Sequence, residues 1–485
     1  MGTSYENLTF KGIGYNSIAK ILMYVFSAMA SIILGRCLVA SDYGIVSFAF
    51  IFINFMGNFA DFGIGSALIQ RKEIDETALY TAFTLKCILG GAALVVTFAL
   101  SALAPLFFDN PQIVVIIRLL SLYFLITIIS FLPVSLLTKE MDFKKISIAE
   151  ISLSVLNSLL AIILALNGYG YWSIVVAFLC ANVVSSIMLY LFKPVAFRFR
   201  FDRKVVQEFI SFGGYLFLSG LLVFFIFNLD NFVIGSVDGS KELGYYAIAY
   251  NWGSMVCVLL YMVVLRVVFP LMVKLQGEEQ QVRNAYLKTV EYTGYLVVLV
   301  NVLLFAVSRE FLVCILGHNS DKWLPALISL RILCLYGILR GLLEPIGQVI
   351  IAKGDTKILF KANILATVFE VGTVYPALKY FGIEGVACTV TFAYLLQYLV
   401  YYFYLKNRLQ IGVKSIVRAV WPSFCAAVPM VILYPFIAGY HEDSIVYFLA
   451  KATIMTVLYI ATLGIITRWE IFKLVASLLA TGKRA

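Results

Sequence analysis

Long runs of apolar residues alternate with short polar stretches over the whole chain. A helix that crosses a bilayer needs about 20 mostly apolar residues, and the sequence contains fourteen runs of roughly this length. They cover residues 12–38, 43–63, 79–104, 113–137, 146–166, 171–191, 210–234, 243–269, 289–316, 328–351, 358–380, 385–405, 416–438 and 444–467. The pattern predicts an all-α polytopic membrane protein with about 14 transmembrane helices.

Two sequence echoes recur about two hundred residues apart. Residues 33–35 end the first span and residues 42–44 begin the second. Similar residues at 233–235 and 243–245 end the seventh span and begin the eighth. In a second echo, Arg118, Leu120, Leu122 and Tyr123 recur as Arg331, Leu333, Leu335 and Tyr336. Spans 1–6 and 7–12 are therefore expected to form two parallel six-helix lobes, with spans 13 and 14 as an added helix pair.

The repeat also predicts how the chain divides into parts. The first lobe with a basic linker is expected over residues 1–200. The second lobe is expected over residues 201–410, and the extra spans with a tail over residues 411–485. Duplicated membrane bundles of this kind are typical of alternating-access transporters.

The charge distribution supports this topology and excludes a nucleic-acid partner. The chain is 62% hydrophobic and 13% charged, with a net charge of +10. Most of its 37 Lys and Arg residues fall in alternate loops and at the two ends. The opposite loops hold only Arg36, Lys241, Arg309, Lys322 and Lys379. Positive loops face the cytoplasm, so both termini are expected there.

Polar side chains recur at helical spacing within the first two spans. A charge inside a span costs on the order of 3 kcal/mol unless it faces protein or water. Lys20 and Tyr24 share one face of the first span, and Asn54, Asn58 and Asp61 share one face of the second. We interpret the two faces as walls of a wet cavity. Lys20 reaching the membrane surface, and Asp61 anchoring a span end, are the alternatives.

Two arginines in the second repeat are further candidates for a cationic cavity. Arg266 lies near the inner end of the eighth span, and Arg340 lies near the middle of the tenth, four residues before Glu344. An anchoring role for Arg266, and simple neutralisation of Arg340 by Glu344, are equally open.

Two acids are candidates for ion coupling. Asp230 lies toward the outer side of the seventh span, and Glu370 lies within the eleventh. Neither has an obvious partner on its own helix, and carboxylates have side chains too short to reach the membrane surface. With Asp61 and Glu344 they form the set of residues that we expect to bind H⁺ or Na⁺.

No sequence feature predicts catalysis or a metal site. The chain has no Walker A loop, its eight cysteines include no Cys-x-x-Cys pair, and its outward loops are short. Transport energy is then expected from an ion gradient, the membrane potential or the substrate gradient.

Six local strings are distinctive, and they cover residues 35–44, 61–72, 132–133, 139–145, 228–235 and 243–246. With these strings the chain resembles, over nearly its whole length, the polysaccharide transporter family, the Wzx-type lipid-linked oligosaccharide flippases. The branch that it resembles contains colanic acid and teichuronic acid exporters.

The resemblance implies the fold of the multidrug/oligosaccharidyl-lipid/polysaccharide superfamily, with two six-helix lobes in a V. It implies a substrate too, an oligosaccharide repeat unit on undecaprenyl pyrophosphate, moved from the inner to the outer leaflet of the bacterial cytoplasmic membrane. A cationic cavity would then contain Lys20, Arg266 and Arg340, with Tyr24, Asn54 and Asn58 meeting the sugars. The other expected partners are membrane lipids and the polysaccharide polymerase machinery.

Two other functions are weighed against the flippase. A multidrug or organic-cation antiporter of the same superfamily would favour acids over a basic cavity. A membrane polysaccharide polymerase or ligase would need a sizeable outward loop for its chemistry. The mixed charges and the short outward loops favour the flippase over both.

Overall fold

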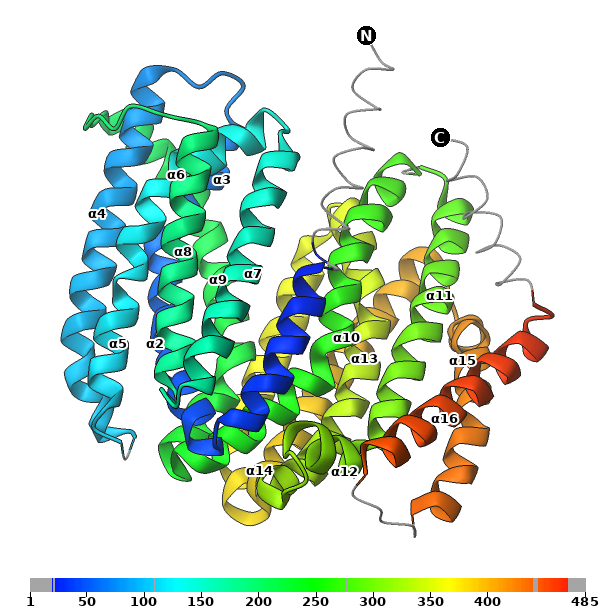
Figure 1. Ribbon diagram of the computed structural model, residues 1–485. Helices are drawn as coiled ribbons and strands as arrows, with labels where there is room; N and C mark the ends of the chain where they lie inside the picture. Colours follow the sequence, from blue (N-terminus) through cyan, green and yellow to red (C-terminus); the bar gives the residue numbers. More distant parts are fainter. Residues whose placement is uncertain (1–19, 21, 109, 276, 439–443, 470–485) are drawn as a thin grey trace. The chain divides into compact units, whose positions relative to one another are not determined.

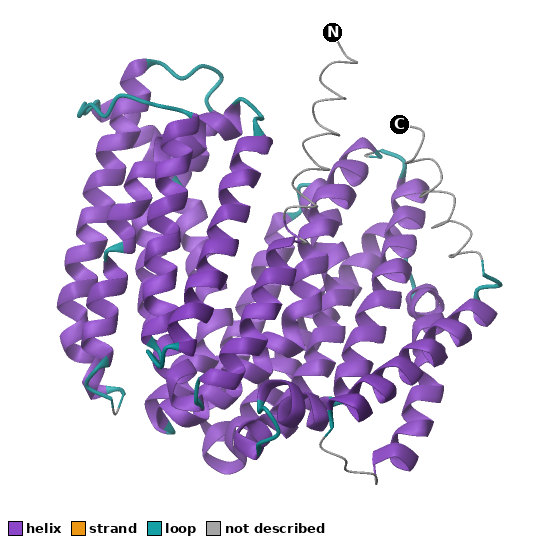
Figure 2. Ribbon diagram, in the orientation of Figure 1, coloured by secondary structure: helices purple, strands orange, loops and turns teal. Residues whose placement is uncertain are grey.

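A computed structural model describes residues 20, 22–108, 110–275, 277–438 and 444–469 of the protein. Within these residues every regular element is a helix (Figures 1 and 2). A helix over Leu22–Cys37 comes first. The elements that follow are α2 (Ala40–Asp61), α3 (Ile64–Gln70), α4 (Glu76–Leu100), η1 (Ser101–Leu106), α5 (Ile113–Ser121), α6 (Tyr123–Lys139), α7 (Phe143–Leu166), α8 (Trp172–Phe192), α9 (Arg203–Val237), α10 (Gly239–Lys274), α11 (Glu279–Ala306), α12 (Ser308–Glu310), η2 (Phe311–Leu316), η3 (Asp321–Ala326), α13 (Leu327–Ala352), α14 (Thr356–Leu409), α15 (Val413–Ala438) and α16 (Ile445–Ile466).

The predicted spans all have counterparts among these helices. Twelve helices of the described part are long and apolar enough to cross a membrane. One of them, within α14, contains Gly382 with a φ of 64° and a ψ of −157°, which divides it into two of the predicted spans. The helix Leu22–Cys37 is the described part of the first predicted span. The expected all-α polytopic fold is therefore confirmed.

Aspartates fix where several helices begin. Asp202 Oδ1 accepts hydrogen bonds from the backbone nitrogens of Lys204 (2.9 Å) and Val205 (3.1 Å) at the start of α9. Asp75 and Asp142 cap α4 and α7 in the same manner. Such caps bind backbone donors that the first helical turn leaves without partners.

The described helices form two compact units, which divide within α10 between Ala247 and Ile248. In the first unit α7 packs on α8, α2 packs on α4, and α9 packs on α2 and α3. In the second unit α11 packs on α13 and α15, and α15 packs on α16. The division by packing thus places α9, the first span of the second repeat, in the first unit. The expected division at residue 200 concerns the sequence repeat and stays a prediction.

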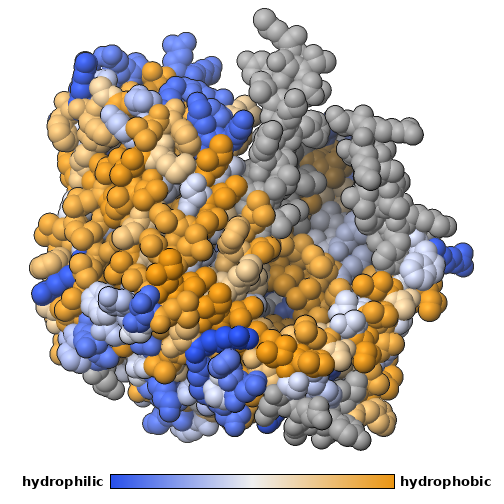
Figure 3. Space-filling model, viewed as in Figure 1, coloured by the Kyte–Doolittle hydropathy of each residue, from blue (hydrophilic) through white to orange (hydrophobic). Residues whose placement is uncertain are grey.

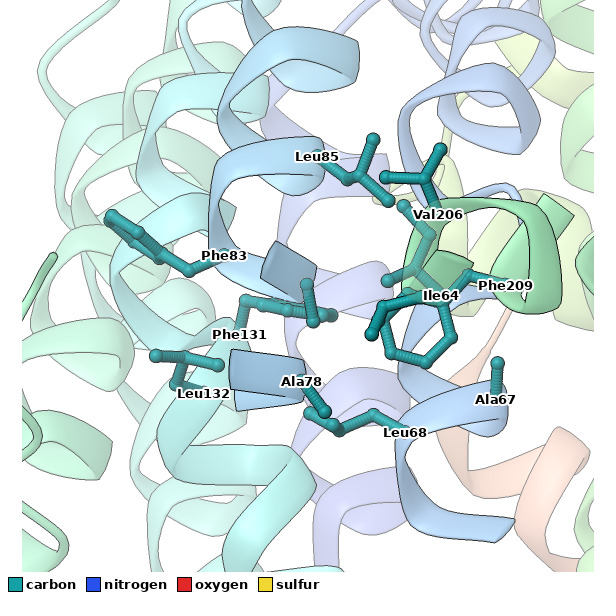
Figure 4. Packing of buried hydrophobic residues seen from close by; sticks show 12 residues of the cluster. Ile64, Ala67, Leu68, Ala78, Phe83, Leu85, Phe131, Leu132, Val206 and Phe209 are labelled. Atoms are coloured by element: carbon teal, nitrogen blue, oxygen red, sulfur yellow. The ribbon is translucent and has the colours of Figure 1, made fainter. Parts of the chain in front are cut away.

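Each unit has its own hydrophobic core. In the first unit, buried side chains of α3, α4, α6 and α9 meet, among them Ile64, Phe131 and Phe209 (Figure 4). In the second unit, α11, α13, α15 and α16 supply the core, with Tyr295 and Tyr459 among its members.

Two glycines bring the matching ends of α2 and α10 into backbone contact within the first unit. A methyl group built on Gly44 would lie 1.7 Å from the Ser240 backbone oxygen, and one built on Gly244 would lie 1.8 Å from the Ala40 oxygen. The two contacts correspond to each other, since Gly44 and Gly244 lie two hundred positions apart, as do Ala40 and Ser240. This reciprocal contact supports the repeat inferred from the sequence.

The surface of the helices is largely apolar. On the face shown in Figure 3, hydrophobic side chains cover the middle of the first unit's helices, and hydrophilic ones gather near the helix ends. Large side chains such as Val95, Leu191 and Val368 are more than half exposed. Surfaces of this kind are expected where hydrocarbon is the surrounding solvent. The protein is a multi-pass membrane protein.

Candidate functional site

A left-handed break ends α2 and holds Asp61 at its last position. Phe62 has a φ of 42° and Gly63 a φ of 70°. The Phe62 amide donates to the Asn58 carbonyl oxygen at 2.9 Å, which closes the helix end. Because glycine alone adopts such angles without strain, Gly63 directs the chain into α3 and leaves the Asp61 side chain exposed.

A cavity of about 550 Å³ opens at this end of α2 in the first unit. Polar and aromatic side chains line it together. The lining residues are Phe50, Ile53, Asn54, Gly57, Asn58, Asp61, Gly63, Ser66, Tyr123, Phe178, Leu216 and Phe217. The predicted residues Asn54, Asn58 and Asp61 are thus brought together on one wall.

Three aromatic rings form another part of this wall. The Phe50 and Phe178 ring centroids lie 5.0 Å apart in an edge-to-face arrangement, and Tyr123 lies 5.2 Å from Phe178. Amide groups beside such rings offer hydrogen bonds and flat apolar faces in one cavity. The sequence pattern alone does not predict a role for these rings, although Tyr123 belongs to the repeated string.

A buried lysine adjoins the acid of the cavity. Lys86 Nζ of α4 lies 3.8 Å from Asp61 Oδ1 and donates to the Ala60 carbonyl oxygen at 3.0 Å. The Lys86 side chain is 7% exposed, whereas that of Asp61 is 65% exposed. The distance between Lys86 and Asp61 shows that a cation partly offsets the carboxylate that faces the cavity.

The second unit buries an arginine among tyrosines. Arg340 Nη1 of α13 donates to the Tyr336 hydroxyl at 3.0 Å, and the guanidinium lies 6.0 Å from the Tyr394 ring centroid. The Tyr336 and Tyr250 hydroxyls share a hydrogen bond of 2.8 Å. Arg340 Nε lies 3.5 Å from Glu344 Oε1. The predicted pair is therefore formed, and a cluster of phenol groups, which we call the tyrosine cluster (Tyr250, Tyr336 and Tyr394), surrounds its cation.

The ring groups of the two units occupy corresponding spans. Phe50 and Tyr250 are two hundred positions apart, as Gly44 and Gly244 are, and Tyr123 corresponds to Tyr336 in the repeated string. The third ring comes from the sixth span in one unit and the twelfth in the other. The repeat thus builds the same aromatic frame twice, and the polar residues added to it differ: amides with Asp61 in one unit, and Arg340 in the other.

Lys20 of the first unit has an acidic partner. Its Nζ lies 2.8 Å from Glu150 Oε2 of α7, and the two side chains are 16% and 36% exposed. Because Glu150 lies on another helix, the spacing of residues within the first span does not predict this pair. Tyr24 lies half-buried on the same helix. Lys20 and Tyr24 are not among the residues that line the cavity described above.

Asp230 is buried in the first unit and fully engaged. It accepts hydrogen bonds from the Tyr246 hydroxyl at 2.7 Å and from the Asn231 backbone nitrogen at 2.7 Å. The Asn231 side-chain amide donates to the same carboxylate at 3.1 Å. These partners lie on the next helix and at the next residue, which a search for polar residues on the same helical face does not find.

Glu370 is 2% exposed within α14 of the second unit. One face of the same helix carries Asn363, whose Oδ1 accepts from Gln397 Nε2 at 3.2 Å across the bend at Gly382. This hydrogen bond joins the eleventh and twelfth predicted spans. Arg266 lies in α10, and its side chain falls outside the part of the chain that the structure describes.

A family model for polysaccharide biosynthesis proteins matches residues 33–328, more than half of the chain. The chain belongs to this polysaccharide biosynthesis protein family. The matched region includes the residues of the first-unit cavity and Asp230. Of the tyrosine cluster it includes Tyr250 and ends before Tyr336 and Tyr394.

Similar proteins take part in making different surface polymers. The lipopolysaccharide biosynthesis protein WzxC of Escherichia coli is 25% identical over 441 residues, 89% of this chain and 87% of that one. The teichuronic acid biosynthesis protein TuaB of Bacillus subtilis is 27% identical and covers 72% of both chains. The succinoglycan biosynthesis transport protein ExoT of Rhizobium meliloti is 22% identical over 77% of this chain and 74% of that protein.

Solved structures share the fold. The lipid II flippase MurJ in an inward closed conformation matches with a TM-score of 0.76 at 16% identity, covering 94% of this chain and 99% of that chain. An inward-facing multidrug transporter of the MATE family, of the MOP superfamily, matches with a TM-score of 0.66 at 18% identity, covering 81% and 98%. The chain therefore shares its fold with this flippase and with this transporter.

Proposed function

We propose that this protein is a flippase for lipid-linked oligosaccharides in surface polysaccharide biosynthesis. It moves undecaprenyl-pyrophosphate-linked repeat units from the inner to the outer leaflet of the bacterial cytoplasmic membrane by alternating access, and it is not an enzyme. Membership of the polysaccharide biosynthesis family supports this assignment. So does its similarity to proteins of lipopolysaccharide, teichuronic acid and succinoglycan biosynthesis.

The observation that carries the proposal is the mixed lining of the first-unit cavity. Sugars present hydroxyl groups around their edges and apolar C–H faces. Asn54 and Asn58 offer amide donors and acceptors for the hydroxyls. Phe50 and Tyr123 offer ring faces against which the C–H surface packs. A cavity of about 550 Å³ has room for a few sugar rings.

The diphosphate needs a cation, because an unpaired buried charge is prohibitive in a low-dielectric medium. Arg340 has a guanidinium that binds phosphate oxygens in a bidentate manner. Its phenol partners Tyr336 and Tyr250 supply further hydroxyl donors. Lys20, Tyr24 and Arg266 complete the proposed substrate-binding set, with the lysine shared with Glu150.

Coupling is assigned to Asp61, Asp230, Glu344 and Glu370, with H⁺ or Na⁺ as the ion. The membrane potential is a second source of energy for export, since moving an anion out of an inside-negative cell gains roughly 2.3 kcal/mol per charge per 100 mV. We assign both termini to the cytoplasm, and the distribution of Lys and Arg supports this assignment. The partners are the lipid-linked substrate, membrane lipids and the polymerase machinery that uses the product.

Deleting the gene in its host tests the proposal. We expect one lipid-linked oligosaccharide to accumulate on the inner leaflet and the corresponding polymer to disappear from the surface. Mass spectrometry of extracted lipids identifies the oligosaccharide, and a plasmid copy of the gene restores the polymer. Normal polymer with increased sensitivity to organic cations would instead indicate a cation antiporter. Accumulation of unpolymerised units on the outer leaflet would indicate a polymerase or ligase.

A further inference from the structure

An arginine near one end of the first unit is held in a defined position. Arg118 Nε of α5 donates to Ser101 Oγ at 3.1 Å, and its guanidinium lies 4.5 Å from the Phe98 ring centroid. Ser101 Oγ in turn donates to the Phe98 carbonyl oxygen at 2.6 Å. The ring and the hydroxyl together fix one edge and one face of the guanidinium.

The second unit contains the same arrangement. Arg331 Nε of α13 donates to Ser308 Oγ at 2.9 Å, and its guanidinium lies 5.4 Å from the Phe305 ring centroid. Ser308 Oγ donates to the Phe305 carbonyl oxygen at 2.8 Å. Arg118 and Arg331 also correspond in the repeated sequence string. The two arginines are therefore counterparts. Since their Nε atoms and ring contacts agree, they can differ only in what binds their terminal nitrogens.

The difference lies at the terminal nitrogens. Arg331 Nη2 donates to the Tyr434 hydroxyl at 2.6 Å. Tyr434 belongs to α15, which is part of the helix pair added after the repeat. In the part of the chain that the structure describes, no residue donates to or accepts from the terminal nitrogens of Arg118. The first repeat thus has the same arginine without the oxygen that binds its counterpart.

The surface around Arg118 is apolar. The residues at positions −3, +4, +7 and +11 from Arg118 share its helical face. They are Val115, Leu122, Leu125 and Ile129, and they are between 38% and 49% exposed. Arg118 lies five residues after the start of α5 at Ile113, or about 7.5 Å along the helix axis. It therefore stands near the membrane surface, at the head of an apolar track that runs toward the membrane centre.

We propose that this track binds a phospholipid, with its phosphate on the terminal nitrogens of Arg118 and one acyl chain along Val115, Leu122, Leu125 and Ile129. A guanidinium whose two terminal nitrogens have no hydrogen-bond partner among the described residues matches a phosphate diester in charge and geometry. A lipid-facing cation needs such an anion. Under the orientation expected from the charged loops, the lipid belongs to the outer leaflet. The site is separate from the cavity and from the tyrosine cluster.

Lipid binding to the purified full-length protein tests this. In native mass spectrometry, titration with phosphatidylglycerol and, separately, with diacylglycerol reports the apparent affinity for each. We expect the wild type to prefer phosphatidylglycerol. Arg118→Gln should weaken phosphatidylglycerol binding by at least about tenfold, since a charge-assisted hydrogen bond is lost. Diacylglycerol binding should be unchanged. This result would show that the variant is folded.

Arg331→Gln is the matched control, because Tyr434 already occupies the terminal nitrogens of Arg331. It should bind phosphatidylglycerol as the wild type does. The proposal is overturned if Arg118→Gln keeps the preference for phosphatidylglycerol, or if both variants lose it equally. It is also overturned if Arg118→Gln instead converts a larger assembly to the monomer, because the track would then hold a protein helix.

Discussion

At the scale of single residues, the central feature is an arginine in contact with three other polar side chains. The Arg340 side chain is only 11% exposed. It contacts Tyr336 and Tyr394 through its guanidinium and lies 3.5 Å from Glu344. A buried cation of this kind either neutralises its acid or awaits an anionic ligand. The two roles predict different behaviour in a pair of variants.

Arg340→Gln should reduce transport at least about tenfold, because the charge-assisted contacts with the diphosphate are lost. The double variant Arg340→Gln/Glu344→Gln separates the two roles, since it removes both members of the pair. If Arg340 binds substrate, the double variant stays inactive. Surface polymer, measured against the amount of protein in the membrane, provides the readout. Recovery in the double variant would show that Arg340 only balances Glu344.

How far the sequence predicted this site depends on the kind of contact. The spacing of Asn54, Asn58 and Asp61 predicted a shared polar face, and the structure places all three at one cavity. Contacts between helices were not predicted, because helical periodicity carries no information on which helices are neighbours. Lys86 beside Asp61 and Tyr246 beside Asp230 are of this second kind.

At the scale of elements, glycines and one buried ion pair determine how helices meet. Gly44 and Gly244 let α2 and α10 approach until backbone touches backbone. The ion pair joins Lys451 of α16 to Glu310 of α12 at 2.5 Å, with side chains 2% and 7% exposed. The first contact ties the two repeats together at one point, and the second attaches the added helix pair to the second unit.

Gly44→Ala and Gly244→Ala should each destabilise the protein by about 1–3 kcal/mol, because the new methyl group overlaps a backbone oxygen that cannot move alone. Gly91→Ala in α4 is the control, since nothing lies within 4 Å of the added carbon. It should be neutral or slightly stabilising. Denaturation midpoints in detergent compare the three. Equal midpoints for all variants would rule out the close contact.

Lys451→Met should destabilise the second unit by about 3–5 kcal/mol, since it leaves the Glu310 carboxylate buried without its cation. Adding Glu310→Gln should recover a large part of that loss, because the uncompensated charge is then removed. Thermal unfolding in detergent measures both steps. A single variant as stable as the wild type would contradict the ion pair.

The sequence predicted the elements well for a physical reason. A span must be apolar over about 20 residues, so hydrophobicity alone identifies it, and all fourteen predicted runs have a helical counterpart. Helix ends were predicted less closely. The left-handed break at Phe62 and Gly63 depends on local backbone angles, and α9 begins at its Asp202 cap several residues before the apolar run.

At the scale of the whole molecule, a duplicated frame carries two different sets of polar residues. Each unit places three aromatic rings at corresponding spans, and each adds its own chemistry to them: amides with Asp61 in one, and Arg340 in the other. Taken separately, the amides suit sugar hydroxyl groups and Arg340 suits an anionic phosphate. The sequence predicted the repeat and identified Asn54, Asn58, Asp61 and Arg340 as candidate residues. The grouping of the aromatic rings was not predicted, because it depends on which helices are neighbours.

Transbilayer movement of the substrate by the purified protein tests the account most directly. Proteoliposomes would contain an undecaprenyl-diphosphate oligosaccharide with a fluorescent sugar, and an impermeant reagent would quench the outward-facing headgroups. The account predicts that, with wild-type protein, the reagent also quenches the substrate that began in the inner leaflet. With Arg340→Gln, this inner pool should stay fluorescent, as it does in protein-free liposomes. An inner pool that stays protected with folded wild-type protein, with the membrane potential imposed, would contradict the proposed function.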